Sequence, residues 1–246
     1  MNFYSVIIGS ELLNGRRSDA HFSFLNSELL KRGWEQKANF VIKDDPKFIE
    51  DVFNLVKNDP DAVMFSFGGI GATPDDHTRQ CAANVFTDKK LEIHGEAKKC
   101  ILDRFGEDAY PHRINMANLP VDAKLLKNVV NNIPAFYLED RFFFVPGFPS
   151  MSHPMIIEAL DKLYPKNKAK IRLTVKADTS ENDIIDIMKK IPVNIDVSSL
   201  PQIKGEKRLV VVSVADVDEV VARKYFDMFI EFFDSQNVNY EIGKDS

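Results

Sequence analysis

The chain has few of the residues that would mark a disulfide-rich or membrane-spanning protein. It contains two cysteines in 246 residues, Cys81 and Cys100, and both stand in helix-like stretches without a CxxC or Cys/His spacing. We therefore expect reduced thiols and no redox or metal site built on them. No apolar run approaches the roughly 18 residues that cross a bilayer, and charged residues soon follow the apolar residues 3–9. These absences predict a soluble cytoplasmic protein.

An excess of positive charge is also missing. Lysine and arginine number 32 against 37 aspartates and glutamates, so the formal net charge is −5. A positively charged surface that binds nucleic acid is therefore not expected. The length and the hydrophobic fraction of 44% instead suit a globular chain with one domain of about 150 residues and a small companion.

Short apolar runs alternate with helical patterns in the first part of the chain. Strands are expected over residues 3–9, 34–42, 62–65 and 141–145. Helices are expected after Asp19 and after Pro46. Their apolar positions are Phe22, Leu25, Leu29 and Leu30 in the first helix, and Phe48, Ile49, Val52, Phe53 and Val56 in the second. This alternation predicts an α/β fold with a mostly parallel sheet covered on both faces.

The composition changes at the polar, basic run 164–170, which is typical of a linker. We therefore divide the chain into a domain over residues 1–165 and a small α/β domain over residues 171–246. In the second domain we expect strands at 171–176, 208–214 and 238–242, and helices at 181–190 and 217–233. No catalytic constellation is visible there.

A glycine-rich segment, residues 66–78, follows the strand at 62–65. Ligands of parallel α/β sheets bind outside the carboxyl ends of the strands. Gly68, Gly69 and Gly71 would let the backbone approach a ligand closely. Thr73 as N-cap, Pro74 at N1 and Asp76 at N3 predict a capping box that opens a helix, whose free N–H groups favour an anion. The alternative is a tight turn whose acidic residues only compensate the helix dipole.

Two adjacent carboxylates, Asp75 and Asp76, belong to the same segment. They would repel a phosphate unless a cation lay between them, so Mg²⁺ or another divalent cation is expected as cofactor. The segment is neither a Walker A motif nor GxGxxG, because the spacing differs and no Lys-Ser/Thr pair follows.

Four segments carry a family resemblance in their order along the chain. Residues 68–78 match GGxGxTxDDxT, and residues 9–15 with Asp19 match GDELLxG…D. Met116-Ala117 with Pro120 and Asn128 is similar to KxA…P…N, and residues 146–149 are similar to PGVP. Residues 1 to about 165 therefore resemble the molybdopterin-binding fold of the MoaB/MogA superfamily, especially the N-terminal region of CinA-type competence/damage-inducible proteins. The resemblance implies a three-layer domain, followed by a small α/β domain.

The resemblance also implies roles for particular residues. Asp76 and Asp44 would be catalytic, and Glu11, Asp75 and Asp76 would hold the metal. The expected phosphate- or ligand-binding residues are Gly68, Gly69, Gly71, Thr73, Thr78, Ser10, Asn128, Pro146 and Gly147. Several have a structural alternative: Asp44 as a helix cap, Glu11 as a surface carboxylate, Thr78 bonded back to its helix, and Asn128 closing a turn. His77 is read as a helix-face residue, and the other four histidines as structural.

Three functions follow from the resemblance. The first is a metal-dependent pyrophosphatase acting on ADP-ribose or FAD-like diphosphates, and the second is a nucleotide- or pterin-binding protein without catalysis. The third is adenylyl transfer to molybdopterin. Ser10, Asn115 and Met151 stand where the family usually has Asp, Lys and Glu. The chain ends at Ser246, before the deamidase domain of full-length CinA proteins, so amide hydrolysis is not expected. The resemblance also implies self-association into a homo-oligomer.

Overall fold

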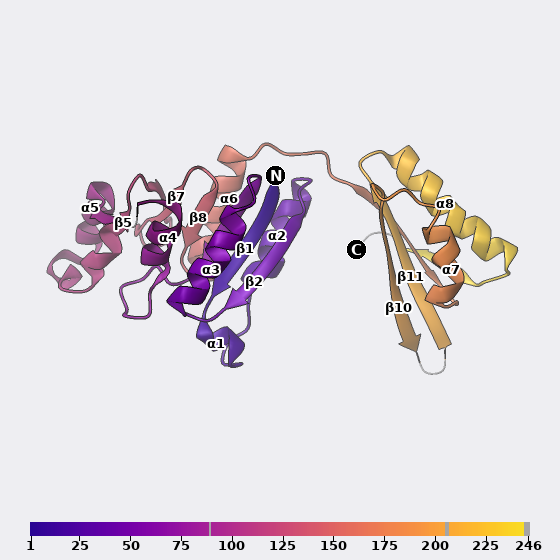
Figure 1. Cartoon of the computed structure of the whole chain (residues 1–246), viewed down its shortest axis with the longest axis horizontal. Coiled ribbons are helices and arrows are strands. Elements are labelled where there is room, and N and C mark those ends of the chain that lie inside the picture. The colour runs from indigo at the N-terminus through magenta and orange to yellow at the C-terminus, as the bar shows by residue number, and fades with distance from the viewer. Residues whose placement is uncertain (89, 205–206, 244–246) are drawn as a thin grey trace. The chain divides into compact units, whose positions relative to one another are not determined.

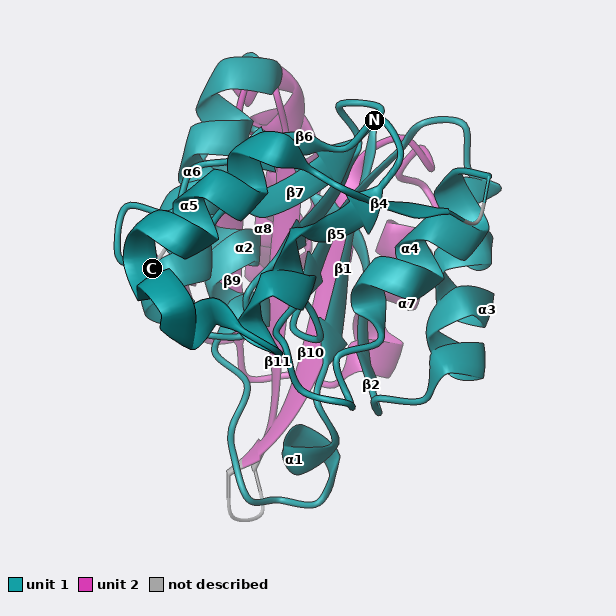
Figure 2. Ribbon diagram, turned by 90° about the vertical axis from the view of Figure 1, so that its left-hand side faces the viewer, with its two compact units in different colours: residues 1–167 teal, residues 168–246 magenta. Residues whose placement is uncertain are grey.

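The computed structural model describes residues 1–88, 90–204 and 207–243. The chain forms two compact units, residues 1–167 and residues 168–246 (Figure 2). The division falls inside the polar run 164–170. Each unit has a buried apolar core built from its own residues.

A six-stranded sheet forms the middle of the first unit, with the order β2-β1-β3-β8-β7-β6 (Figure 1). Its strands are β1 (Asn2–Ile8), β2 (Gln36–Ile42), β3 (Ala62–Phe67), β6 (Lys124–Leu126), β7 (Ala135–Leu138) and β8 (Phe142–Val145). The first four strands of that order pair in parallel, while β7 and β6 are antiparallel. All residues of β3 are buried, as expected where both faces of a parallel sheet are covered.

Helices cover both faces of this sheet and make the predicted three layers. They are α1 (Ser10–Leu13), α2 (His21–Lys31), α3 (Pro46–Lys57), α4 (Thr78–Phe86), α5 (Gly95–Phe105) and α6 (Pro149–Leu163). Short elements complete the unit: η1 (Gly106–Ala109), η2 (Arg113–Ala117), β4 (Leu91–Ile93) and β5 (Asn118–Pro120). One apolar cluster joins the sheet to α3, α4 and α5, and another joins it to α2 and α6.

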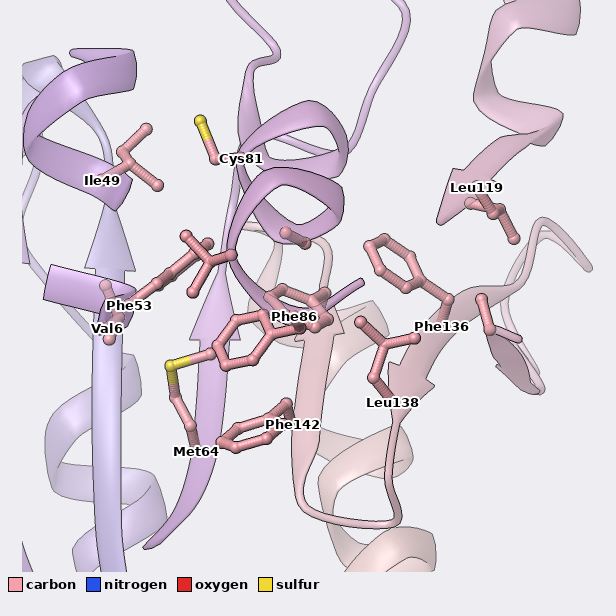
Figure 3. Close-up of a cluster of buried hydrophobic side chains, with 14 of the residues drawn as sticks. Val6, Ile49, Phe53, Met64, Cys81, Phe86, Leu119, Phe136, Leu138 and Phe142 are labelled. Carbon is pink, nitrogen blue, oxygen red and sulfur yellow. The ribbon is translucent and has the colours of Figure 1, made fainter. Parts of the chain in front are cut away.

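Aromatic side chains fill much of the first cluster (Figure 3). The rings of Phe86 and Phe142 stack with centroids 4.2 Å apart, and Phe53 lies 5.7 Å from Phe86. Cys81 is buried beside them and is a free thiol, as is Cys100. Burial raises the pKa of the Cys81 thiol to about 12, so this sulfur is held in its unreactive protonated form.

The apolar stripes of two helices are narrower than their sequences suggest. Phe48 was expected on the inner face of α3 but is 50% exposed, because the buried face is centred on Ile49, Val52, Phe53 and Val56. That set has the i, i+3, i+4, i+7 spacing, and Phe48 lies about 100° away from Ile49 around the helix axis. In α2, Leu25 and Leu29 are buried, while Phe22 and Leu30 are exposed.

The second unit is a four-stranded antiparallel sheet with the order β10-β11-β9-β12. Its elements are β9 (Ile171–Ala177), α7 (Glu181–Met188), β10 (Asp196–Lys204), β11 (Lys207–Asp216), α8 (Glu219–Ser235) and β12 (Tyr240–Gly243). Both helices pack on one face of the sheet through a common apolar cluster (Figure 1). The chain order βαββαβ is that of the split βαβ motif.

The strand β10 was not predicted from the sequence. It carries Pro201, which has no N–H for a ladder and argues against a central strand. The structure places β10 at the edge of the sheet, where a proline is tolerated. In the described parts of the chain, no helix combines the length and the apolar character required to cross a membrane.

Candidate functional site

The glycine-rich segment leaves the end of β3 in a conformation that requires glycine. Gly68 and Gly69 have φ values of +99° and +67°. A Cβ atom on Gly68 would lie 2.4 Å from the carbonyl oxygen of Ile8, and one on Gly69 would lie 2.3 Å from Thr78 Oγ1. The glycines therefore allow the segment to pass directly over the end of β1 and to close on the start of α4.

The predicted capping box at Thr73 is wrong, because α4 begins at Thr78. Thr73 instead closes a turn within the loop: its N–H and its hydroxyl both donate to Asp76 Oδ2, at 2.7 and 2.6 Å. The N–H of Thr78 then donates to Gly69 O, and its hydroxyl donates to Gly68 O at 3.0 Å. Local bonds thus fold residues 68–77 into an ordered loop before the helix starts.

Asp44 joins the loops that follow β1 and β2. Its Oδ2 accepts hydrogen bonds from the N–H and the hydroxyl of Ser10, both at 2.8 Å. The alternative role of Asp44 as a helix cap is wrong, because Asp45 caps α3 by accepting from the N–H of Phe48. The Asp44 carboxylate is therefore held at the carboxyl ends of β1 and β2 and does not cap α3.

These loops surround a cavity of about 560 Å³, which we call the loop cavity. Of the residues expected at the site, those that line it are Gly68, Gly69, Gly71, Thr73, Asp75, Asp76, Glu11, Asp44, Asn128, Pro146 and Gly147. Ser10 and Thr78 do not line it and lie behind its wall, where each bonds a residue that does. The carboxyl ends of β1, β2, β3 and β8 thus converge on one site.

The predicted metal ligands do not form a metal-binding cluster. Across residues 1–88, 90–204 and 207–243, no three His, Cys, Asp or Glu groups are close enough to hold one ion. Asp76 Oδ2 accepts from Thr73, and Glu11 lies beside Arg17, with 3.9 Å between Oε1 and Nη1. The carboxylates Glu11, Asp75 and Asp76 line the cavity as separate groups, so in the described part of the chain they do not form a shared ligand set for one cation.

Asn128 contributes a buried amide to the loop cavity. It is 2% exposed, and its Oδ1 accepts from the N–H of Val130 at 3.0 Å. The turn-closing role is therefore confirmed. Its Nδ2 is buried and has no hydrogen-bond partner among the described residues. This leaves an unpaired donor on a side chain that lines the cavity.

Two arginines at the cavity were not expected from the sequence. Arg17 lies over the ring of Phe148, with its guanidinium carbon 5.6 Å from the ring centroid. Arg79, in the first turn of α4, is only 8% exposed. The position of Arg79, directly after the glycine-rich segment and its threonine, was the available signal in the sequence. Apolar side chains complete the wall: Phe105, Met116, Ile133 and Phe136.

A pair of histidines lies behind the same wall. His21 stacks on Phe67 with centroids 4.4 Å apart, and its Nε2 is 3.3 Å from Gly147 O. The ring of His153 is perpendicular to that of His21 at 5.5 Å. Burial lowers the pKa of His21, against the opposite effects of Asp19 and the Gly147 carbonyl. Both rings are therefore favoured in their neutral forms, since burial also lowers the pKa of His153.

Comparison with known proteins places the first unit of the chain in a family. Residues 5–166 match the profile described as "Probable molybdopterin binding domain". A CinA-like protein of Fusobacterium nucleatum is 30% identical over 172 residues, which are 69% of this chain and 42% of that protein. A protein of Pyrococcus abyssi is 25% identical over 257 residues, covering 97% of this chain and 98% of its own length.

The crystal structure of the CinA protein of Thermoplasma acidophilum, a protein of unknown function, is also similar. It has a TM-score of 0.59 and 26% identity, and it covers 66% of this chain and 98% of its own. The present chain spans less than half of the length of its Fusobacterium relative. Because the family profile matches well over half of the residues, the chain belongs to the molybdopterin-binding-domain family, with similarity to its CinA-type members.

Proposed function

We propose that the loop cavity binds a phosphorylated nucleotide or pterin. The observation that carries this proposal is Asn128 Nδ2, a buried donor in the cavity wall with no partner among the described residues. An unpaired buried donor costs about 1–3 kcal/mol. A ring nitrogen or an oxygen of a ligand would remove that cost.

The rest of the wall supports a ligand of this type. The glycine loop presents backbone at close range, and Arg17 and Arg79 supply positive charge for phosphate. Phe105 and Phe136 offer apolar surface to a flat heterocycle. The volume of about 560 Å³ is in the range of small-molecule sites. The family description as molybdopterin-binding favours a pterin among the candidates.

Binding is tested by calorimetry on the full chain with AMP, ADP-ribose, FAD and a phosphorylated pterin. We expect saturable binding of at least one of these compounds with a stoichiometry of one site per chain. A chain that binds none of them, while its thermal unfolding remains cooperative, contradicts the proposal.

A second candidate is hydrolysis of the diphosphate in ADP-ribose or FAD-like compounds. The observation in its favour is that Asp44 and Asp76 line the same cavity as the glycine loop. Water would attack one phosphorus, the bond from that phosphorus to the bridging oxygen would break, and a carboxylate would accept the proton of the water. For ADP-ribose the products are AMP and ribose 5-phosphate. Because the cavity carboxylates do not form a metal-binding cluster, a divalent cation would be bound mainly by the diphosphate oxygens of the substrate.

Hydrolysis is tested with ADP-ribose and FAD in the presence of Mg²⁺, Mn²⁺ or Co²⁺. Asp44→Asn and Asp76→Asn are assayed beside the unchanged chain. Turnover that disappears in these variants supports catalysis. Equal turnover in all three proteins indicates a contaminating enzyme and contradicts catalysis by this chain. Ligand binding without turnover supports the binding function and contradicts hydrolysis.

A further inference from the structure

The segment between β1 and α2 projects from the carboxyl end of the sheet (Figure 2). Its one-turn helix α1 has no buried residue, and residues 13–20 are all exposed. Leu13 is apolar but is 51% exposed. A segment with so few buried apolar contacts adds little to the stability of the core, and it can change its position at low cost.

Both ends of this segment are anchored. At its start, the Ser10 hydroxyl donates to Asp44 at 2.8 Å. At its end, Asp19 accepts from two N–H groups at the start of α2, at 2.8 and 3.0 Å. Among the described residues, the hydrogen bonds of residues 11–18 stay within residues 9–18. The segment can therefore move as a unit between two fixed ends.

Two side chains of the segment line the loop cavity, Glu11 and Arg17. Arg17 also lies over the ring of Phe148, which is 56% exposed and directly precedes α6. The Arg17 guanidinium is 3.9 Å from Glu11 Oε1, and these two side chains are 45% and 40% exposed. Exposed ion pairs and exposed cation–π contacts are weak. The segment is therefore held beside the cavity by contacts that a ligand can replace.

We infer that residues 11–18 form a lid, which closes over the loop cavity when an anionic ligand binds. This inference rests on the proposed binding function and adds a conformational step to it. The negative charge of the ligand competes with Glu11 for Arg17, so the closed lid makes a contact that the open lid lacks. Closure also covers the exposed ring of Phe148. A ligand shifts such an equilibrium through this difference in contacts between the two positions.

Trypsin tests the lid on the full chain, because it cleaves after Arg16 and Arg17, which are both exposed. Lys166 is the control in the same sample, since it is exposed in the polar run 164–170. The probes are AMP, ADP-ribose, FAD and a phosphorylated pterin, and mass spectrometry identifies the fragments. We expect rapid cleavage after both arginines without ligand, and cleavage slowed about tenfold or more by a saturating probe. Cleavage after Lys166 should keep its rate.

Two matched substitutions test whether Arg17 closes the lid. Arg17→Gln removes the charge that contacts the ligand and leaves the cleavage site at Arg16. Arg16→Gln leaves the cleavage site at Arg17, and Arg16 is exposed and is not among the residues that line the loop cavity. We expect a probe to slow cleavage in Arg16→Gln as in the unchanged chain, and to slow it less than about twofold in Arg17→Gln. Calorimetry sets the probe concentration at which both variants are equally saturated.

The outcomes distinguish the lid from the function on which it rests. A probe that binds without slowing cleavage after Arg16 and Arg17 overturns the lid and leaves ligand binding in place. Equal slowing after Lys166 also overturns the lid, because it indicates general stabilisation of the chain, and so does slow cleavage after both arginines without ligand. Equal slowing in the two variants overturns the role of Arg17. Failure of all four probes to bind overturns the proposed function, and the lid with it.

Discussion

Ser10 and Asp44 are 34 residues apart in the sequence and share two hydrogen bonds of 2.8 Å at the carboxyl ends of β1 and β2. The parallel pairing of β1 with β2 brings them together, because it matches Ile8 with Ile42 at the ends of the two strands. The pair holds the first two loops of the site in a defined relation. The Asp44 carboxylate that lines the loop cavity is thereby oriented by a neighbouring strand.

Removal of the Ser10 hydroxyl should lower the free energy of unfolding. We expect Ser10→Ala to cost about 1 kcal/mol, since the Asp44 carboxylate loses one of two donors. Urea unfolding measures the change. Ser18→Ala is the control in the same region, because Ser18 is exposed and its side chain makes no hydrogen bond within the described chain. Equal effects of the two substitutions would contradict this role for Ser10.

Gly68→Ala should unfold or displace the glycine loop. The new Cβ would lie 2.4 Å from Ile8 O, in addition to the strain of a φ of +99°. Gly15 also has a positive φ, +79°, but a Cβ there meets nothing within 4 Å. We therefore expect Gly15→Ala to cost about 1 kcal/mol of backbone strain and Gly68→Ala to cost several times more. Thermal unfolding of both variants checks the ratio, and similar melting temperatures would sink the prediction.

Replacement of the Asn128 amide should weaken ligand binding more than it weakens the turn. Asn128→Asp keeps an oxygen that accepts from Val130 N but replaces the Nδ2 donor with a second acceptor. We expect a loss of AMP affinity of about tenfold. Asn131→Asp is the matched control, because Asn131 also lines the cavity and its Oδ1 accepts from Ile133 N. Binding is followed by calorimetry at constant ionic strength, and comparable losses in both variants would count against a specific role for Asn128.

Stability should decrease on acidification because of His21. Burial lowers its pKa in the folded chain below the ordinary 6.5, so the unfolded chain takes up the proton first as the pH falls. The contribution of neutral His21 is therefore fully present well above pH 6.5, and it is lost as the pH falls through 6.5 toward the lower pKa of the folded chain. Urea midpoints between pH 7.5 and 5.5 should shift less in His21→Gln. The exposed His112→Gln should behave like the unchanged chain, and parallel pH profiles for all three would refute the prediction.

Residues 1–167 should fold without the second unit. Both apolar clusters of this part are made from its own residues, and the third cluster belongs to residues 168–246. We expect the shorter chain to unfold in one cooperative transition and to bind AMP with an affinity within about twofold of that of the full chain. Circular dichroism and calorimetry test this expectation. A non-cooperative transition in residues 1–167 would show that the second unit supplies part of its stability.

Local residue patterns in the sequence were enough to predict much of the fold. The β-branched and aromatic runs predicted β1, β3 and β8, and glycine at 68 and 69 predicted a backbone that passes close to another segment. These features depend on residues near one another in the chain. The strand β10 escaped prediction because the tolerance for Pro201 depends on which strand is at the edge of the sheet.

The sequence by itself determined the strand-to-helix segments of the site, the glycine loop and the family to which the chain is similar. Only the tertiary structure decided which hydrogen bonds and contacts those segments make with one another. Strand register paired Ser10 with Asp44, and the turn at Thr73 moved the start of α4 to Thr78. Burial left Arg79 Nε and Asn128 Nδ2 without hydrogen-bond partners among the described residues. The physical reason is that backbone conformation is set by neighbours along the chain. Hydrogen-bond satisfaction and electrostatic pairing are set by groups that only folding brings together.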